Sequence, residues 1–206
     1  MQSQNMPNMQ GQQNITGQGT SHNHGAHELF DAHELIGGML SMMDQYKLYE
    51  QQIQDQELKD ILQRQATFMT QMYNTIVESF QTGQDPQTPT QQYKMTQSNE
   101  VIYGLKPGQP KKPKQTASEL TDECYSSFML ELVKGSTATF SMAALEMNNP
   151  IVRRIIADSL PNLIEMGYEI FLYQNKHGYY QVAQLTPQDM NTMVQTYGKA
   201  PQTNIH

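Results

Sequence analysis

Hydrophobic residues recur at helical spacing in four long segments, and this pattern predicts four helices. The segments are residues 26–52, residues 56–80, a third from about Ser118, and a fourth that starts after Asn149. In each, apolar side chains return every three or four positions, as in a helix with one face buried. The last two segments meet at Asn148-Asn149-Pro150, where the pattern stops and restarts sharply.

The apolar stripes predict which side chains form the core. In the first segment the main stripe is Leu29, Ile36, Leu40 and Met43, with Leu35, Met39, Met42 and Tyr46 beside it. In the second it is Leu58, Ile61, Leu62, Met69, Met72, Ile76 and Phe80. In the third it is Leu120, Cys124, Phe128, Leu132, Met142 and Leu145. In the fourth it is Val152, Ile155, Ile156, Leu163, Met166, Ile170 and Tyr173.

Residues that start and stop helices stand at the predicted boundaries. Asp55 is placed to cap the second helix, and Pro150 to open the fourth, where its missing N–H has no helical partner to lose. Thr116-Ala117-Ser118-Glu119 has the spacing of a capping box and predicts that the third helix starts there. Gly178, after Lys176-His177, predicts the end of the fourth.

Connection lengths predict how the helices are arranged. The four-residue link 51–54 makes the first two helices an antiparallel hairpin, residues 26–80. The second hairpin and a short C-terminal element occupy residues 116–198, and residues 199–206 form a loose tail. The proline-containing crossover 81–115 joins the hairpins. One long crossover is typical of ferritin-like folds, so we expect an all-α, ferritin-like four-helix bundle.

Two polar segments are expected to stay outside the core. Residues 1–25 are rich in Gln, Asn and Met without periodicity, and we expect a disordered tail. His22, His24 and His27 lie at its end, but a flexible tail holds no ligand geometry, so we predict no metal site there. The basic run 106–114 is interpreted as a solvated linker, with contact to an acidic partner as the alternative.

Composition narrows the function classes. The formal net charge of −7 disfavours nucleic-acid binding, which needs a basic surface. Only 16% of residues are charged, and much of the polarity is glutamine, so copies repel one another weakly and tolerate dense packing. No apolar run predicts a membrane span, and no signal peptide is recognised, so we expect the protein to stay where it is synthesised, in the cytoplasm.

Catalytic and metal-binding constellations are not found in the sequence. Di-iron bundles carry Glu-x-x-His on two helices, and this motif does not occur here. His33 is interpreted as a partly buried, hydrogen-bonded histidine, and Cys124 as a small buried residue. The acids of the last two helices are expected to lie mostly off the apolar stripes: Glu131, Glu146, Glu165 and Glu169. We therefore predict no enzyme and no catalytic, cofactor-binding or metal-binding residue.

One stretch of the chain resembles a known family. Residues 143–150 (AALEMNNP), Val152-Arg153-Arg154 and residues 168–180 (YEIFLYQNKHGYY) are similar to the spore coat protein F family of endospore-forming bacteria. The resemblance covers about Cys124 to Leu185. It implies a ferritin-like bundle without metal chemistry, made during sporulation and deposited in the spore, in its coat or an associated layer.

The resulting prediction is a structural spore component that works by protein–protein packing, with other coat proteins as partners and self-association as an option. An assembly adaptor with a groove between the helix pairs is the first alternative, and a metal-binding ferritin-like protein the second. Cross-linking of Gln to Lys, or of Tyr179 and Tyr180, is suggested by composition alone, and ordinary solvated side chains are the simpler interpretation.

Overall fold

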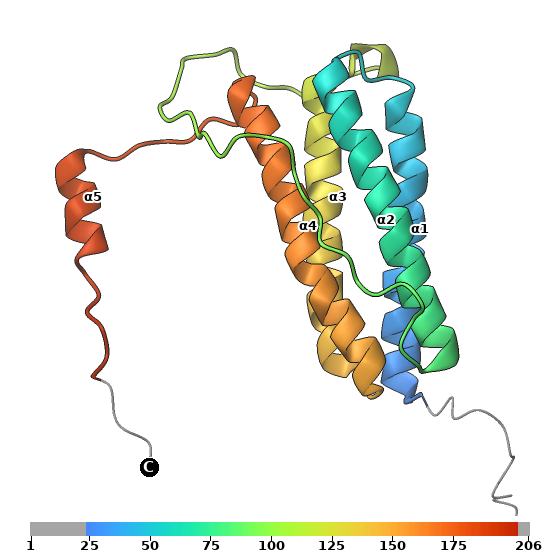
Figure 1. Cartoon of the computed structure of the whole chain (residues 1–206). Coiled ribbons are helices and arrows are strands. Elements are labelled where there is room, and N and C mark those ends of the chain that lie inside the picture. Colours follow the sequence, from blue (N-terminus) through green and yellow to red (C-terminus); the bar gives the residue numbers. More distant parts are fainter. Residues whose placement is uncertain (1–23, 202–206) are drawn as a thin grey trace, which may run out of the picture.

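The computed structural model describes residues 24–201, which form helices joined by irregular segments (Figure 1). The long helices are α1 (Ala26–Glu50), α2 (Gln56–Thr82), α3 (Asp122–Glu146) and α4 (Pro150–Lys176). A 3₁₀ turn, η1 (Ala117–Glu119), precedes α3, and a short α5 (Pro187–Val194) follows α4. The predicted all-α class is confirmed. The N-terminal tail, except for its last two residues, and the final five residues lie outside the described range.

Four helices pack side by side in one bundle (Figure 1). α1 contacts α2 and α3, and α4 contacts the same two helices, so each helix has two neighbours. α1 and α2 run antiparallel, as do α3 and α4, and the crossover returns along the bundle so that α2 and α3 run in the same direction. The likeness to ferritin stays a prediction. Within residues 24–201, no helix is long and apolar enough to cross a membrane.

The predicted stripes are correct for α2 and α4, whose members are buried except for the half-buried Phe80. In α1 the buried set is the one predicted beside the main stripe, and in α3 the predicted stripe is wrong in phase. α1 buries the neighbouring set, Leu35, Met39, Met42 and Tyr46, and exposes Leu40. α3 buries Tyr125, Met129, Leu130, Val133, Phe140, Ala143 and Ala144.

The error in α3 has a physical cause. Its apolar residues are spread around the helix, so their period alone does not fix which side faces inward. Small residues, Ala143 and Ala144, take the tight positions against the other helices. Leu145 is left 85% exposed to solvent, although the sequence placed it in the core.

Side-chain caps fix where α2 and α4 begin. The Oδ1 atom of Asp55 accepts from the N–H groups of Glu57 (2.8 Å) and Leu58 (3.2 Å), as predicted. Asn149 caps α4 in the same way, with Pro150 in the first turn. Gly178 follows α4 with φ of 74°, a conformation that favours glycine.

The predicted start of the third helix is wrong by four residues. The N–H of Thr116 does donate to the Glu119 carboxylate (3.1 Å), but this pair encloses only η1. Leu120 is then extended, with ψ of 135°, which breaks the helical path. α3 begins after Thr121 instead.

Replacing the cap of α4 should lower stability. Asn149→Ala removes the bonds from the N–H groups of Ile151 (2.8 Å) and Val152 (3.2 Å), together with a bond to the Gly83 carbonyl (3.3 Å). We expect the free energy of unfolding to fall by about 1 kcal/mol, measured by urea denaturation. Asn148→Ala is the matched control, because Asn148 is exposed. Equal losses in the two variants would contradict the assigned capping role.

Candidate functional site

Three side chains of α4 hold the crossover against the groove between α2 and α4. The Oδ1 atom of Asn162 accepts from the Tyr93 N–H (2.8 Å), and its Nδ2 donates to the Gln91 carbonyl (2.9 Å). Asn175 binds both backbone groups of Ile102, at 2.6 and 3.0 Å. The third side chain, Glu169, lies between them along the helix. This part of the crossover is therefore a fixed element of the bundle.

Glu169 is the centre of the site. Its side chain is 0% exposed, and four donors surround its two carboxylate oxygens. Oε1 accepts from the Arg64 guanidinium (2.6 Å) and the Thr96 N–H (3.1 Å). Oε2 accepts from the Tyr93 hydroxyl and from Nε2 of Gln65 (3.3 Å). The donors come from α2 and the crossover, so the carboxylate joins three parts of the chain. We call Glu169 and its four donors the clasp.

The clasp extends through Gln65 to the first helix. The Gln65 side chain is fully buried, and its Oε1 accepts from the Tyr46 hydroxyl of α1 (2.9 Å). Its Nε2 also donates to the Met166 carbonyl of α4 (3.1 Å). A buried amide that uses both of its ends holds its neighbours in one register. α1, α2, α4 and the crossover are thus connected by one polar network.

The electrostatics of the clasp follow from burial and from the carboxylate. Burial raises the pKa of Tyr93, and the hydrogen bond and charge of Glu169 raise it further. Burial also raises the pKa of Tyr46. Burial opposes the charge on Arg64, but its hydrogen bonds to Glu169 and Tyr93 outweigh this, so the pKa of Arg64 is raised. Both tyrosines are therefore held neutral and the arginine charged.

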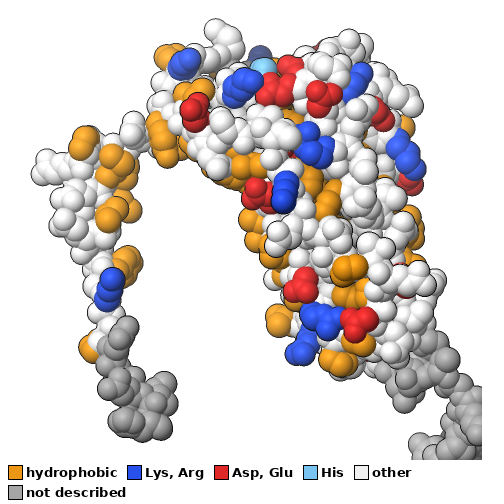
Figure 2. Space-filling model, viewed as in Figure 1, with side chains coloured by type: hydrophobic (Ala, Val, Ile, Leu, Met, Phe, Trp, Pro, Cys, Tyr) orange, Lys and Arg blue, Asp and Glu red, His pale blue; other side chains and the backbone are white. Residues whose placement is uncertain are grey.

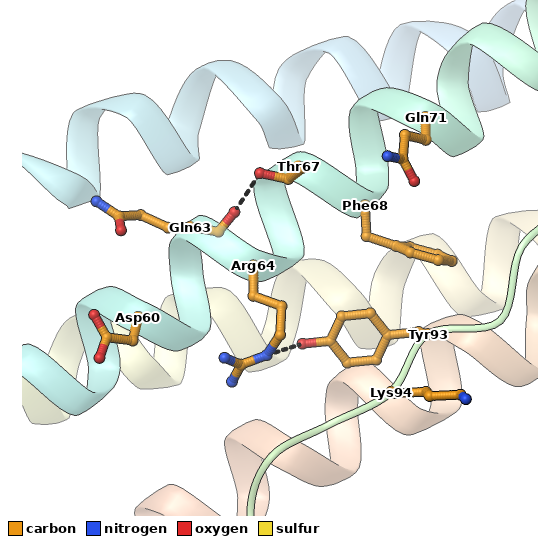
Figure 3. A pocket seen from close by; sticks show the side chains of 8 residues that line it. All are labelled: Asp60, Gln63, Arg64, Thr67, Phe68, Gln71, Tyr93 and Lys94. Carbon is orange, nitrogen blue, oxygen red and sulfur yellow. Dashed lines mark hydrogen bonds between the residues drawn. The ribbon is translucent and has the colours of Figure 1, made fainter.

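A shallow pocket opens beside the clasp (Figure 3). It encloses about 450 Å³ and is lined by Asp60, Gln63, Arg64, Thr67, Phe68, Gln71, Tyr93 and Lys94. The Phe68 ring packs edge-on to Tyr93, with ring centroids 5.2 Å apart. Two of the polar residues that line the pocket, Arg64 and Tyr93, donate to Glu169. The pocket therefore offers an arginine and a tyrosine that already hold the fold together.

The sequence interpretation missed Glu169. It was expected off the apolar stripes, and this is wrong, because Glu169 lies seven residues after Asn162 and four before Tyr173. That helical spacing places all three on the face of α4 that packs inward or against the crossover. The other acids named with it stay nearer solvent: Glu131 and Glu146 are exposed and Glu165 is half-buried.

The remaining candidate residues lie apart from the clasp. His33 is exposed, with its ring edge-on to Phe80, so the predicted partly buried histidine is wrong. Cys124 is half-buried rather than buried. Among residues 24–201 no three His, Cys, Asp or Glu side chains gather as metal ligands. In the basic run, Lys111 pairs with Glu123 (2.6 Å).

Two of the three histidines named near the end of the N-terminal tail, His24 and His27, lie within the described residues. His22 lies outside the described residues, and His27 is exposed. Nδ1 of His24 lies 3.1 Å from the carboxylate of Glu28, which is fully buried. The other contacts of Glu28 include the N–H of Asn149 (3.2 Å). This second buried acid joins the start of α1 to the start of α4, and the sequence interpretation missed it too.

Removing the central carboxylate should destabilise the bundle strongly. Glu169→Ala leaves the charged Arg64 and the Tyr93 hydroxyl without the carboxylate that accepts from them, and we expect a loss of about 3 kcal/mol in the free energy of unfolding. Glu165→Ala, one turn earlier on α4, is the matched control and should cost less than about 0.5 kcal/mol. Urea denaturation measures both. Similar losses in the two variants would show that the clasp does not stabilise the fold.

The clasp also predicts a loss of stability at alkaline pH. A tyrosine titrates near pH 10 in the unfolded chain. Since its folded pKa is raised, Tyr93 contributes stability that is complete below about pH 10 and decreases above it, by up to about 1.4 kcal/mol per pH unit. Tyr93→Phe should therefore give a shallower decline than wild type in urea denaturation from about pH 8 to 11.

Tyr197→Phe is the control for this measurement. It removes a hydroxyl from a side chain that is 88% exposed, and its decline should match that of wild type. An equally steep decline in wild type and Tyr93→Phe would rule out a protected tyrosine in the clasp.

Comparisons with known proteins identify the family of the chain. The Coat F domain matches residues 121–183, which contain α3, α4 and the clasp residue Glu169. The spore coat protein F-like protein YhcQ of Bacillus subtilis (strain 168) is 45% identical over 183 residues, 87% of this chain and 84% of that protein. No solved structure matches. The resemblance seen in the sequence is confirmed, and the chain belongs to the family of spore coat protein F-like proteins.

Proposed function

We propose that this protein is a structural component of the bacterial spore, made during sporulation and held in the coat or an associated layer by packing against other coat proteins. The observation that carries the proposal is the 45% identity to a spore coat protein F-like protein across 84% of its length. The buried polar groups support it, since those of the clasp bind one another. The polar side chains of the clasp therefore stabilise the fold.

The surface supports a packing role. Large apolar side chains are exposed on three helices of the bundle: Phe30 and Leu48 on α1, Met142 and Leu145 one turn apart on α3, and Ile164 on α4. Single exposed apolar residues are normal, but on an amide-rich surface with few charges they permit close contact between neighbours. We propose that such contacts, made in many directions, hold the protein in a layer.

The alternative functions stay weaker proposals. An adaptor was expected to use a groove between the helix pairs. On the α2–α4 side that space is filled by the crossover, where Tyr93 is buried. For a metal-binding bundle, the candidate acid with an inward position is Glu169, and its oxygens already accept from Arg64, Tyr93, Gln65 and Thr96. We propose a non-enzymatic role on these grounds.

The spore role is tested by following the protein in a sporulating cell. A fluorescent fusion expressed from the native promoter should appear only after sporulation begins and should gather at the forespore and then on the released spore. The fluorescent protein alone, under the same promoter, is the control for timing without targeting. Even fluorescence throughout growing cells, or loss of the fusion from mature spores, would overturn the proposal.

A further inference from the structure

α5 is an amphipathic helix whose apolar side has no partner in the structure. It stands away from the bundle at the end of a short tether (Figure 1), and none of its residues is buried within the described chain. Met190, Met193 and Val194 lie at i, i+3 and i+4 of α5, which makes one apolar stripe, and Tyr197 follows three residues after the helix ends. We call residues 183–197 the arm. A helix of eight residues is not stable alone in water, so the stripe needs a surface to cover it.

A groove of matching character runs along the outer side of the bundle, between α3 and α4. It holds about 470 Å³. Buried Val133 and Leu163 line it, and the rim residue Ile164 is 62% exposed. At Gly167 a Cβ atom would lie 3.3 Å from Val133, so the glycine lets the helices approach closely there. Figure 2 shows hydrophobic side chains on α5 and along the edge of the bundle nearest to it.

The arm and the groove share one spacing. On α4 the groove is lined at 163, 164, 167, 168 and 171, and α5 carries its apolar residues at 190, 193 and 194, so both surfaces have the i, i+3, i+4 pattern of a helical face. Ladders of equal period let one helix lie in the groove between two others. Charge agrees as well. The charged residue in the groove lining is Lys134, and the charged residue of α5 is Asp189.

The root of the arm is fixed against the crossover, and from there the chain runs away from the bundle (Figure 1). Val182 forms a parallel bridge with Tyr103 of the crossover, and its carbonyl accepts from the Gly104 N–H (2.8 Å). Only residues 183–186 separate this bridge from α5, a reach of about 13 Å when extended. Tyr180, two residues before Val182, already lines the groove. The tether therefore has little room to turn α5 back into the groove of the same chain.

We propose that the arm of one copy docks in the α3–α4 groove of a second copy, with the apolar stripe of α5 facing Ile164, Tyr168 and Phe171. The inference goes beyond the proposed function, since it concerns how copies of this chain hold one another. If each of two copies docks its arm on the other, a closed dimer forms. If each copy docks its arm on the next copy, an open chain of copies forms. Both assemblies use the same contact.

The chain offers a direct readout because it contains no tryptophan. Tyr197→Trp places a single fluorophore on the arm, at an exposed position three residues after α5 ends. In the purified full-length protein, tryptophan emission should shift to shorter wavelength as concentration rises from about 5 to 500 µM, with a dissociation constant on the order of 10–100 µM for so small a contact. Sedimentation velocity should show the mass rising over the same range. If the tryptophan emission lies at the shorter wavelength at every concentration while the mass stays that of a monomer, the arm docks within its own chain, and the proposal is overturned.

Paired variants identify the two surfaces. Met193→Asp on the arm and Ile164→Asp on the groove should each weaken self-association at least about tenfold. An equimolar mixture of the two should associate again, because one variant keeps an intact groove and the other an intact arm. Thr192→Asp, on the opposite side of α5, and Leu145→Asp, an exposed apolar residue outside the groove, are the controls and should associate like wild type.

Each remaining outcome is decisive. Wild-type protein that is monomeric at all concentrations, or a mixture that does not associate, would overturn arm exchange. Controls that disrupt association as strongly as the paired variants would overturn it too, because general stickiness would then explain the contact. None of these results would bear on the location of the protein in the cell.

Discussion

The fold depends on a carboxylate that has no access to water. An ionised carboxylate inside a protein costs several kcal/mol unless charges and hydrogen-bond donors surround it. Glu169 receives a guanidinium, a phenol, an amide and a backbone N–H. No single helix supplies them, so the cost is offset only when α2, α4 and the crossover are all in place. This requirement links the folding of the crossover to that of the bundle.

The position of the crossover then determines the other end of the molecule. Once Thr96 is held at Glu169, Ile102 is placed to meet Asn175 six residues further along α4. Tyr103 follows and forms the bridge to Val182. The direction in which the chain leaves the bundle toward α5 is therefore set through a series of backbone contacts that begins at the buried acid. A loop of this length is restrained here by side chains of both α2 and α4.

The sequence predicts the parts of this architecture that depend on local rules. Helix periodicity and caps gave α2 and α4 correctly, because their apolar residues are confined to one side and Asp55 and Pro150 mark their starts. α1 and α3 carry apolar residues around most of their surface, so the inward side was decided by packing. Thr116 and Glu119 do form a capping box, but they cap the 3₁₀ turn η1 and not α3, because the extended conformation of Leu120 ends the helical path.

The clasp lay beyond those rules for a different reason. A glutamate in an amphipathic helix is normally a surface residue, and what buries Glu169 is a partner about a hundred positions away, Arg64. The position of Tyr93 is equally non-local, since a lone tyrosine in a polar, proline-containing segment carries no periodic signal. The spacing of Asn162, Glu169 and Asn175 was visible in the sequence. Its meaning appears only when the crossover lies on that face.

The clasp also favours one packing arrangement of the chain over others. An apolar core of similar volume is often as stable as a buried ion pair, or more so, so stability alone does not require Glu169 and Arg64. Their need for donors from three segments disfavours every arrangement in which the crossover lies elsewhere. A component that repeats many times in a layer must present the same outer surface in every copy. In the role that we propose, a buried polar network that disfavours other packings supplies that uniformity.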